Sequence, residues 1–81
     1  MESYHTYQDN SALLGRTIKM MREKRQLTQE DLSEAADTGV PYISEIENGK
    51  ANPSLKVITK LAIAFNLSIA ELFSAQNNQL G

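Results

Sequence analysis

The chain has 81 residues, which suffice for one domain with one hydrophobic core and leave no room for a second. It contains no cysteine, so disulfides, thiolate nucleophiles and cysteine-based zinc sites are excluded. No apolar run approaches the roughly 20 residues that a transmembrane helix needs, and the N-terminus lacks a signal-peptide pattern. We therefore expect a cytoplasmic protein without a membrane partner.

The charges are segregated along the chain, although the net charge of −2 at first argues against a nucleic-acid partner. Five of the eight basic residues fall within residues 16–25, and the other three are Lys50, Lys56 and Lys60. Six of the ten acidic residues lie between these groups. Both a basic face on an acidic protein and an ordinary solvated helix surface fit this distribution.

The first helix is predicted over residues 12–24, with Ser11 as its N-cap. Its apolar stripe has helical spacing and consists of Leu14, Ile18 and Met21. Residues 1–11 are polar and have no periodicity, so we expect a flexible N-terminal arm. Leu27 then turns back into the core.

Thr28 is predicted to open the second helix, because Asp31 three residues later completes a capping-box pattern. The buried edge of this helix is expected to comprise Leu32, Ala35 and Ala36. Residues 37–39 break the helix, and Gly39 serves both the turn and the next N-cap. Since Pro41 fits only in a first helical turn, the third helix starts near Val40 and directs Ile43 and Ile46 inward.

The third helix ends at Asn48-Gly49, a pair typical of a left-handed C-cap. Ser54 caps a fourth helix that runs to about Phe65, and Ser68 with Glu71 opens a short fifth helix that ends near Phe73. The expected inner stripe of the fourth helix is Leu55, Ile58, Leu61, Ala62 and Phe65. The expected organisation is an all-α domain over residues 12–73, followed by a disordered tail over 74–81.

Two short helices joined by a tight turn, from Thr28 to Asn48, have the pattern of a helix-turn-helix. The sequences Leu-Thr-Gln-Glu-Asp-Leu at 27–32 and Tyr-Ile-Ser-Glu-Ile-Glu-Asn-Gly-Lys at 42–50 resemble the Cro and phage-repressor (XRE) family, as do Asn-Pro-Ser-Leu at 52–55 and Leu-Ser-Ile-Ala-Glu-Leu-Phe at 67–73. The resemblance implies a compact five-helix, lambda-repressor-like DNA-binding domain of the stand-alone type, similar to phage repressors and restriction-modification controller proteins. Asp37, Thr38 and Gly39 depart from the usual glycine, hydrophobic residue and Ser/Thr cap.

By this resemblance the third helix, about residues 40–48, lies in the major groove of an operator. Its first turn and outer face then carry the candidates for base contact, Val40, Pro41, Ser44 and Glu45. Val40 and Pro41 suit a thymine methyl group, Ser44 donates or accepts, and Glu45 accepts from cytosine. A solvated or salt-bridged side chain is the alternative for Glu45.

Phosphate contacts are expected on both sides of the reading helix. Gln29 lies where free N–H groups and the helix dipole favour an anion, and the family uses this glutamine to orient the reading helix. Asn48 has the alternative role of a simple helix cap. The candidates for phosphate contact are Arg16, Thr28, Gln29, Tyr42, Asn48, Lys50 and Asn52.

An acidic stripe on the second helix consists of Glu30, Glu34 and Asp37. Its interpretations are solvated surface, a contact with RNA polymerase as in some family members, or a metal or acid/base site. The last is poorly supported, because no histidine partner or apolar cleft accompanies the carboxylates. We expect neither an enzyme nor a metal. An antitoxin or another interaction module with secondary DNA binding is the alternative function.

A homodimer is expected, because one reading helix contacts few base pairs and each wrong pair costs only about 1–3 kcal/mol. Two copies on a (pseudo)palindromic operator would be spaced by about 34 Å. The candidates for the dimer interface, at the end of the fourth helix and in the fifth, are Ile63, Ile69, Leu72 and Phe73. Leu72 and Phe73 could serve the core of the single chain instead. No cofactor and no pocket for a small-molecule ligand are evident.

Overall fold

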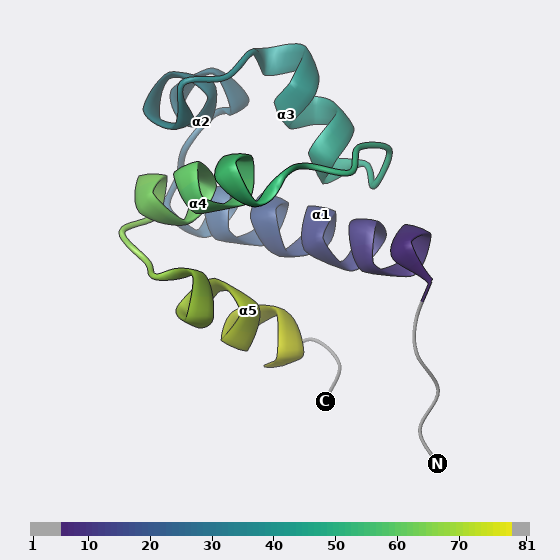
Figure 1. The fold of residues 1–81 in the computed structure, drawn as a ribbon. Helices are drawn as coiled ribbons and strands as arrows, with labels where there is room; N and C mark the ends of the chain where they lie inside the picture. Colours follow the sequence, from purple (N-terminus) through teal and green to yellow (C-terminus); the bar gives the residue numbers. More distant parts are fainter. Residues whose placement is uncertain (1–5, 79–81) are drawn as a thin grey trace.

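The computed structural model describes residues 6–78, and all regular secondary structure within this range is helical. The helices are α1 (Tyr7–Lys24), α2 (Gln29–Ala36), α3 (Val40–Glu47), α4 (Leu55–Ala64) and α5 (Ile69–Asn78). Helix α1 runs through the middle of the domain, with α2 and α3 on one side and α5 on the other (Figure 1). The predicted all-α class with five helices is confirmed.

One core joins all five helices. Helix α1 packs against α3 and α5, and α2 packs against α3 and α4. Leu27 and Leu67, in the turns after α1 and α4, pack against this core as predicted. Its buried members are Leu14, Ile18, Met21, Leu32, Ala36, Ile43, Ile46, Leu61, Ala62, Phe65 and Leu72.

The predicted helix starts at α2, α4 and α5 are confirmed by side-chain caps. The Asp31 N–H donates to Thr28 Oγ1 at 3.0 Å, and the Thr28 N–H donates to Asp31 Oδ2 at 2.9 Å. Ser68 and Glu71 make the same reciprocal pair at the start of α5. The Ser54 hydroxyl accepts from the N–H of Val57. Each cap satisfies donors that the first helical turn leaves unpaired.

The predicted start of α1 and the predicted end of α5 are wrong. Helix α1 begins at Tyr7 instead of Ala12, because Thr6 and Asp9 form a capping box that replaces Ser11 as the start signal. Helix α5 continues five residues beyond Phe73, to Asn78. Ala75 packs against the core, which extends the amphipathic face past the predicted end. Of the arm predicted at residues 1–11 and the tail predicted at 74–81, residues 1–5 and 79–81 lie outside the described residues.

Two burial predictions are also wrong. Leu55 was expected inside but is 66% exposed, because the inner face of α4 passes through Val57, Ile58 and Leu61. Ala35 is exposed on α2. For Leu72, which was expected in either the dimer interface or the core, the structure selects the core, because its side chain is fully buried within the single chain.

No single helix in residues 6–78 is long and apolar enough to cross a membrane. Helices α4 and α5 reach the required length and composition only together, and the pair is bent by 89°.

Candidate nucleic-acid interface

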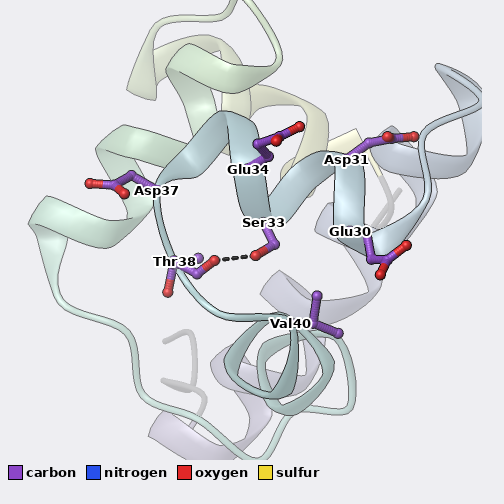
Figure 2. Close-up of a pocket in the computed structure, with 7 residues that line it drawn as sticks. All are labelled: Glu30, Asp31, Ser33, Glu34, Asp37, Thr38 and Val40. Atoms are coloured by element: carbon purple, nitrogen blue, oxygen red, sulfur yellow. Dashed lines mark hydrogen bonds between the residues drawn. The ribbon is translucent and has the colours of Figure 1, made fainter.

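A tight turn places α3 against α2 (Figure 2). Asp37 ends α2 in the left-handed region at φ 54°, and its N–H and that of Thr38 close the last turn of the helix. The Ser33 hydroxyl donates to the Thr38 carbonyl, which ties the turn to α2. Gly39 is the N-cap of α3 and Pro41 lies in its first turn, as predicted. The turn residues that depart from the family pattern thus still form a closed helix-turn-helix.

Helix α3 has one buried face and one open face. Ile43 and Ile46 are at most 1% exposed, so they fix the helix on the core. Pro41 and Glu45 are exposed, and Ser44 is half-buried with its hydroxyl accepting a 3.4 Å hydrogen bond from Asn48 Nδ2. Pro41, Ser44 and Glu45 thus lie on the side of α3 that is not packed on the core, and their contact with bases stays a prediction.

Val40 lies differently from the other candidates for base contact. Its side chain is half-buried and lines the hollow between α2 and α3, beside Glu30 (Figure 2). Any base that Val40 meets must therefore approach from the α2 side of the reading helix.

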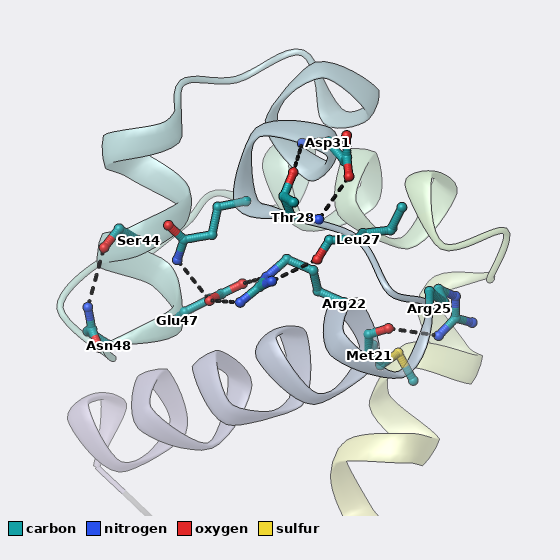
Figure 3. Close-up of polar contacts among 10 residues, drawn as sticks. Met21, Arg22, Arg25, Leu27, Thr28, Asp31, Ser44, Glu47 and Asn48 are labelled. Carbon is teal, nitrogen blue, oxygen red and sulfur yellow. Dashed lines mark hydrogen bonds and ion pairs between the residues drawn. The ribbon is translucent and has the colours of Figure 1, made fainter.

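The C-terminal end of α3 is held by a carboxylate, that of Glu47, which was not among the site residues predicted from the sequence. Glu47 is 7% exposed, and Arg22 of α1 donates to it from Nε at 2.7 Å and from Nη2 at 3.1 Å. Arg22 Nη1 also donates to the Leu27 carbonyl at 2.8 Å, and Gln29 Nε2 donates to Glu47 Oε1 at 3.0 Å (Figure 3). This network, Arg22–Glu47–Gln29, joins α1, α2 and α3 through side chains.

The charge of Arg22 is reinforced by this geometry. The hydrogen bond to Glu47 raises the pKa of the guanidinium, and its effect exceeds the opposing effect of burial. The sequence did contain a signal for the network: Glu47 follows Ile43 and Ile46 at the i+4 and i+1 positions, so it falls on the inner face.

Gln29 has a structural partner at the position expected to bind phosphate. Its amide nitrogen donates a hydrogen bond to Glu47. This bond orients the half-buried side chain of Gln29 at the start of α2. Thr28 uses its hydroxyl oxygen to cap α2, which leaves the hydroxyl hydrogen to donate elsewhere. Both residues border the positive end of the α2 dipole.

The C-terminal end of α3, which also carries Glu47, leads into the loop before α4. Gly49 adopts φ 74°, and the Lys50 N–H donates to the Glu45 carbonyl at 2.9 Å, which completes a Schellman turn. A Cβ on Gly49 would lie 2.9 Å from the Cα of Ala12, so α1 contacts the turn directly.

The loop and the start of α1 form a hollow of about 330 Å³, the loop hollow, lined by Gln8, Ser11, Gly49, Lys50, Ala51 and Asn52. It brings two phosphate candidates, Lys50 and Asn52, together, and both are exposed. Gln8 and Ser11 were missed as members because this part of α1 was expected to be an unfolded arm.

The remaining phosphate candidates lie around α3 and α1. Asn48 is exposed at the end of α3, whereas Tyr42 is half-buried and packs against the core. Arg16 is exposed on α1 next to Gly15. A Cβ at Gly15 would come within 2.3 Å of the Ile46 carbonyl oxygen, so this glycine permits α1 to contact the end of α3.

The acidic stripe lies apart from the loop hollow, on α2. Glu30, Glu34 and Asp37 are exposed and line the open hollow beside Val40 (Figure 2). Lys60 approaches Asp37 at 3.8 Å in an exposed ion pair. Within residues 6–78, no group of three or more histidine, cysteine or carboxylate side chains is arranged to hold a metal ion.

Comparison with known proteins identifies the fold and the motif. Residues 18–72 match the helix-turn-helix family HTH_3, which covers more than half of the chain. The chain belongs to this helix-turn-helix family. The resemblance to XRE-type DNA-binding transcriptional regulators is confirmed.

Two relatives of this helix-turn-helix family are controller proteins. The chain is 39% identical over 56 residues to control protein C.MunI from Mycoplasma sp., a match that covers 69% of this chain and 76% of the relative. The crystal structure of the restriction-modification controller protein C.AhdI from Aeromonas hydrophila superposes with a TM-score of 0.77 at 31% identity. That match covers 80% of this chain and 98% of C.AhdI.

A second similar structure contains DNA. The controller protein C.Esp1396I was solved as a tetramer in complex with its natural 35-base-pair operator. It superposes with a TM-score of 0.80 at 25% identity, and the match covers 95% of each chain. Other relatives are longer, and this chain spans 43%, 59% and 62% of the lengths of three of them.

Proposed function

We propose that the chain binds a specific double-stranded DNA operator as a homodimer and regulates transcription, with α3 in the major groove. The observation that carries this proposal is that α3 is fixed on the core along one face and open along the other. Its inner face is fixed by Ile43, Ile46 and the Arg22–Glu47–Gln29 network, while Pro41 and Glu45 remain exposed. A helix fits the major groove, and a rigidly held one presents its outer face in a defined register.

The proposed roles divide between the face and the ends of α3. Pro41, Ser44 and Glu45 meet base edges, with Val40 at the α2 side. The start of α2, with Thr28 and Gln29, and the loop hollow grip phosphates on the two flanks. The exposed Asn48 and Arg16 add contacts on the same side as the loop hollow, and Tyr42 supports the helix. Phosphate contacts fix the register, whereas base contacts give sequence preference.

Selection of bound fragments from random DNA, at a stated salt concentration, tests this proposal. The expected result is an enriched, two-fold symmetric sequence with half-sites about one helical turn apart. Lys50→Ala should weaken binding to every DNA sequence alike. It should also reduce the slope of the logarithm of the binding constant against the logarithm of salt concentration by about 1. Lys24→Ala, which removes an exposed lysine at the far end of α1, is the matched control. Binding that is weak, salt-sensitive and without any enriched sequence would refute the proposal.

We further propose that the acidic stripe on α2 contacts RNA polymerase. Its three carboxylates are exposed, and Asp37 forms an exposed ion pair with Lys60. Glu30→Lys with Glu34→Lys should abolish activation of an operator-linked reporter while operator affinity stays equal or rises. Glu23→Lys, an exposed charge reversal on α1, is the control. Parallel loss of activation and operator affinity would contradict this role.

A further inference from the structure

The loop hollow is lined by hydrogen-bond donors from two elements and by no carboxylate. Gln8 and Ser11 lie in the first two turns of α1, and Lys50 and Asn52 lie in the loop before α4. Their ammonium, amide and hydroxyl groups all carry N–H or O–H bonds. The neighbouring acid, Asp9, does not line the hollow and accepts a hydrogen bond in the α1 cap instead. The walls of the hollow are therefore suited to an anion.

The donors of the loop hollow are not used elsewhere among residues 6–78. The side chains of Gln8, Ser11, Lys50 and Asn52 make no hydrogen bond or ion pair with another residue of this range. The backbone N–H groups of Ala51 and Asn52 likewise donate to no acceptor in it. A phosphate in the hollow therefore gains donors without breaking a bond within the chain.

The two walls of the loop hollow are held at a fixed spacing. A Cβ on Gly49 would lie 2.9 Å from the Cα of Ala12, so the turn and α1 are in direct contact. The N–H groups of Gly49 and Lys50 bond back to carbonyls of α3 at 3.0 and 2.9 Å. Because Ser11 adjoins Ala12 and Lys50 adjoins Gly49, this contact sets the separation of the walls. Donors that are held in place before binding lose less freedom when an anion binds.

We propose that Gln8 and Ser11 bind the same operator phosphate as Lys50 and Asn52, so that α1 takes part in DNA binding. This inference rests on the proposed function, in which the loop hollow meets the operator backbone, and adds that one phosphate is shared between α1 and the loop. Lys50 supplies the charge, while the neutral donors of α1 fix the position of the phosphate relative to α3.

The dependence of binding on salt concentration separates the two walls. Gln8→Ala should lower affinity for the selected operator about tenfold. It should leave the salt dependence of the binding constant unchanged, because a neutral amide replaces no counter-ion of the phosphate. Asn10→Ala is the matched control, since Asn10 is also an exposed amide at the start of α1 but lies outside the loop hollow. All chains are compared at a temperature at which thermal melting shows them folded.

Two results of this comparison would overturn the proposal. The first is an unchanged operator affinity in Gln8→Ala. The second is an equal loss of affinity in Gln8→Ala and Asn10→Ala, which would show a general effect of substitution in the first turns of α1.

Operators that carry a single neutral methylphosphonate locate the shared phosphate. At one position the modification should weaken binding of the wild type. At that same position Gln8→Ala, Ser11→Ala and Lys50→Ala should each cost less affinity than they do on the unmodified operator, because their common partner has lost its charge. If Gln8→Ala and Lys50→Ala lose their effects at different phosphates, α1 and the loop bind separate groups and the proposal is overturned.

Inorganic phosphate tests the site without DNA. Added to the whole chain at fixed ionic strength, it should shift the amide resonances of Gln8, Ser11, Lys50 and Asn52 saturably, with a Kd in the millimolar range. Gln8→Ala should weaken this binding at least about threefold, and Asn10→Ala should leave it unchanged. If no operator is selected, the proposed function fails, and these shifts still decide whether α1 and the loop share an anion. In that case, shifts that do not saturate, or that are confined to the loop, would overturn the shared site.

Discussion

Glu47 shows how one buried carboxylate sets the position of a whole helix. It accepts two hydrogen bonds from Arg22 and one from Gln29, so the end of α3, the start of α2 and the last turn of α1 meet at one carboxylate. The ion pair is nearly dry, with the two side chains 12% and 3% exposed. Directional bonds of this kind define an orientation that apolar packing alone leaves loose.

Glu47→Ala should destabilise the chain by about 3 kcal/mol in urea unfolding, because it strands a partly buried guanidinium. Glu45→Ala, an exposed neighbour on α3, should change the unfolding free energy by no more than about 0.5 kcal/mol. Arg22→Met together with Glu47→Leu should recover most of the loss, since no charge is then left unpaired. If Glu47→Ala were as stable as the wild type, the Arg22–Glu47–Gln29 network would contribute little to stability.

Asp31 gives a residue-scale prediction about pH. The hydrogen bond from the Thr28 N–H, followed by that with the Thr28 side chain, lowers the pKa of its carboxyl group below the ordinary value. Because this pKa is lower in the folded chain than in the unfolded chain, ionised Asp31 stabilises the fold at pH values above its unfolded pKa, near 4. This stabilisation is lost as the pH falls through the folded pKa. Asp31→Asn should therefore flatten the loss of unfolding free energy as the pH falls below about 5.

The control for this titration is Glu30→Gln, which neutralises a neighbouring carboxylate. Thermal unfolding at a series of pH values should show a steeper acid loss for wild type and Glu30→Gln than for Asp31→Asn. Identical slopes for all three chains would contradict a role for the α2 cap in acid sensitivity.

At the scale of elements, four helices end in the same way. Each is followed by one residue with positive φ, at Gln26, Asp37, Gly49 and Asn66, and N–H groups bond back to the last carbonyls. Only one of these residues is glycine, although the left-handed region costs other residues about 1–2 kcal/mol. Asparagine and aspartate tolerate this region better, so Gln26 carries the greatest strain.

Gln26→Gly should stabilise the chain by about 1 kcal/mol, because glycine enters the left-handed region without a Cβ clash. Asn66→Gly is the matched control at an equivalent helix end, where asparagine already tolerates φ 60° and the gain should be near zero. Differential scanning calorimetry would report both changes. A loss of stability in Gln26→Gly would indicate that the gain in unfolded-chain entropy outweighs the relieved strain.

Most elements were predictable from local chemistry, because caps, turns and apolar spacing act within a few residues. Thr28 with Asp31 and Ser68 with Glu71 predicted helix starts correctly. The same pattern at Thr6 and Asp9 was passed over, because the residues after it are polar and show no apolar stripe. Local signals therefore gave more reliable helix starts than hydrophobic periodicity did.

The candidate site was less predictable, because its members meet only in the folded chain. Gln8 and Ser11 reach the loop hollow across some forty residues of sequence, between α1 and the loop before α4. The partnership of Arg22 with Glu47 likewise requires α1 and α3 to cross near Gly15. Spacing along one helix indicates which face a residue occupies, but it does not identify the partner on another helix.

At the scale of the whole molecule, the proposed dimer needs a surface that the single chain leaves open. Because Leu72 is buried in the core, the remaining candidates for the dimer interface are Ile63, Ile69 and Phe73. Ile69 packs partly against the core, whereas Ile63 is 67% exposed near the end of α4. An isoleucine this exposed gains from a partner, since burying its side chain is worth about 1.5–3 kcal/mol.

Ile63→Asp should produce a folded monomer, because it places a charge in the proposed interface without touching the core. Operator binding should weaken at least about 100-fold, as one half-site is then read alone. Leu55→Asp is the matched control, since Leu55 is equally apolar, 66% exposed and on the same helix but near its opposite end. Sedimentation velocity should show monomers for Ile63→Asp and dimers for wild type and Leu55→Asp. The reverse pattern would move the interface to the start of α4, beside the loop that is proposed to hold the operator backbone.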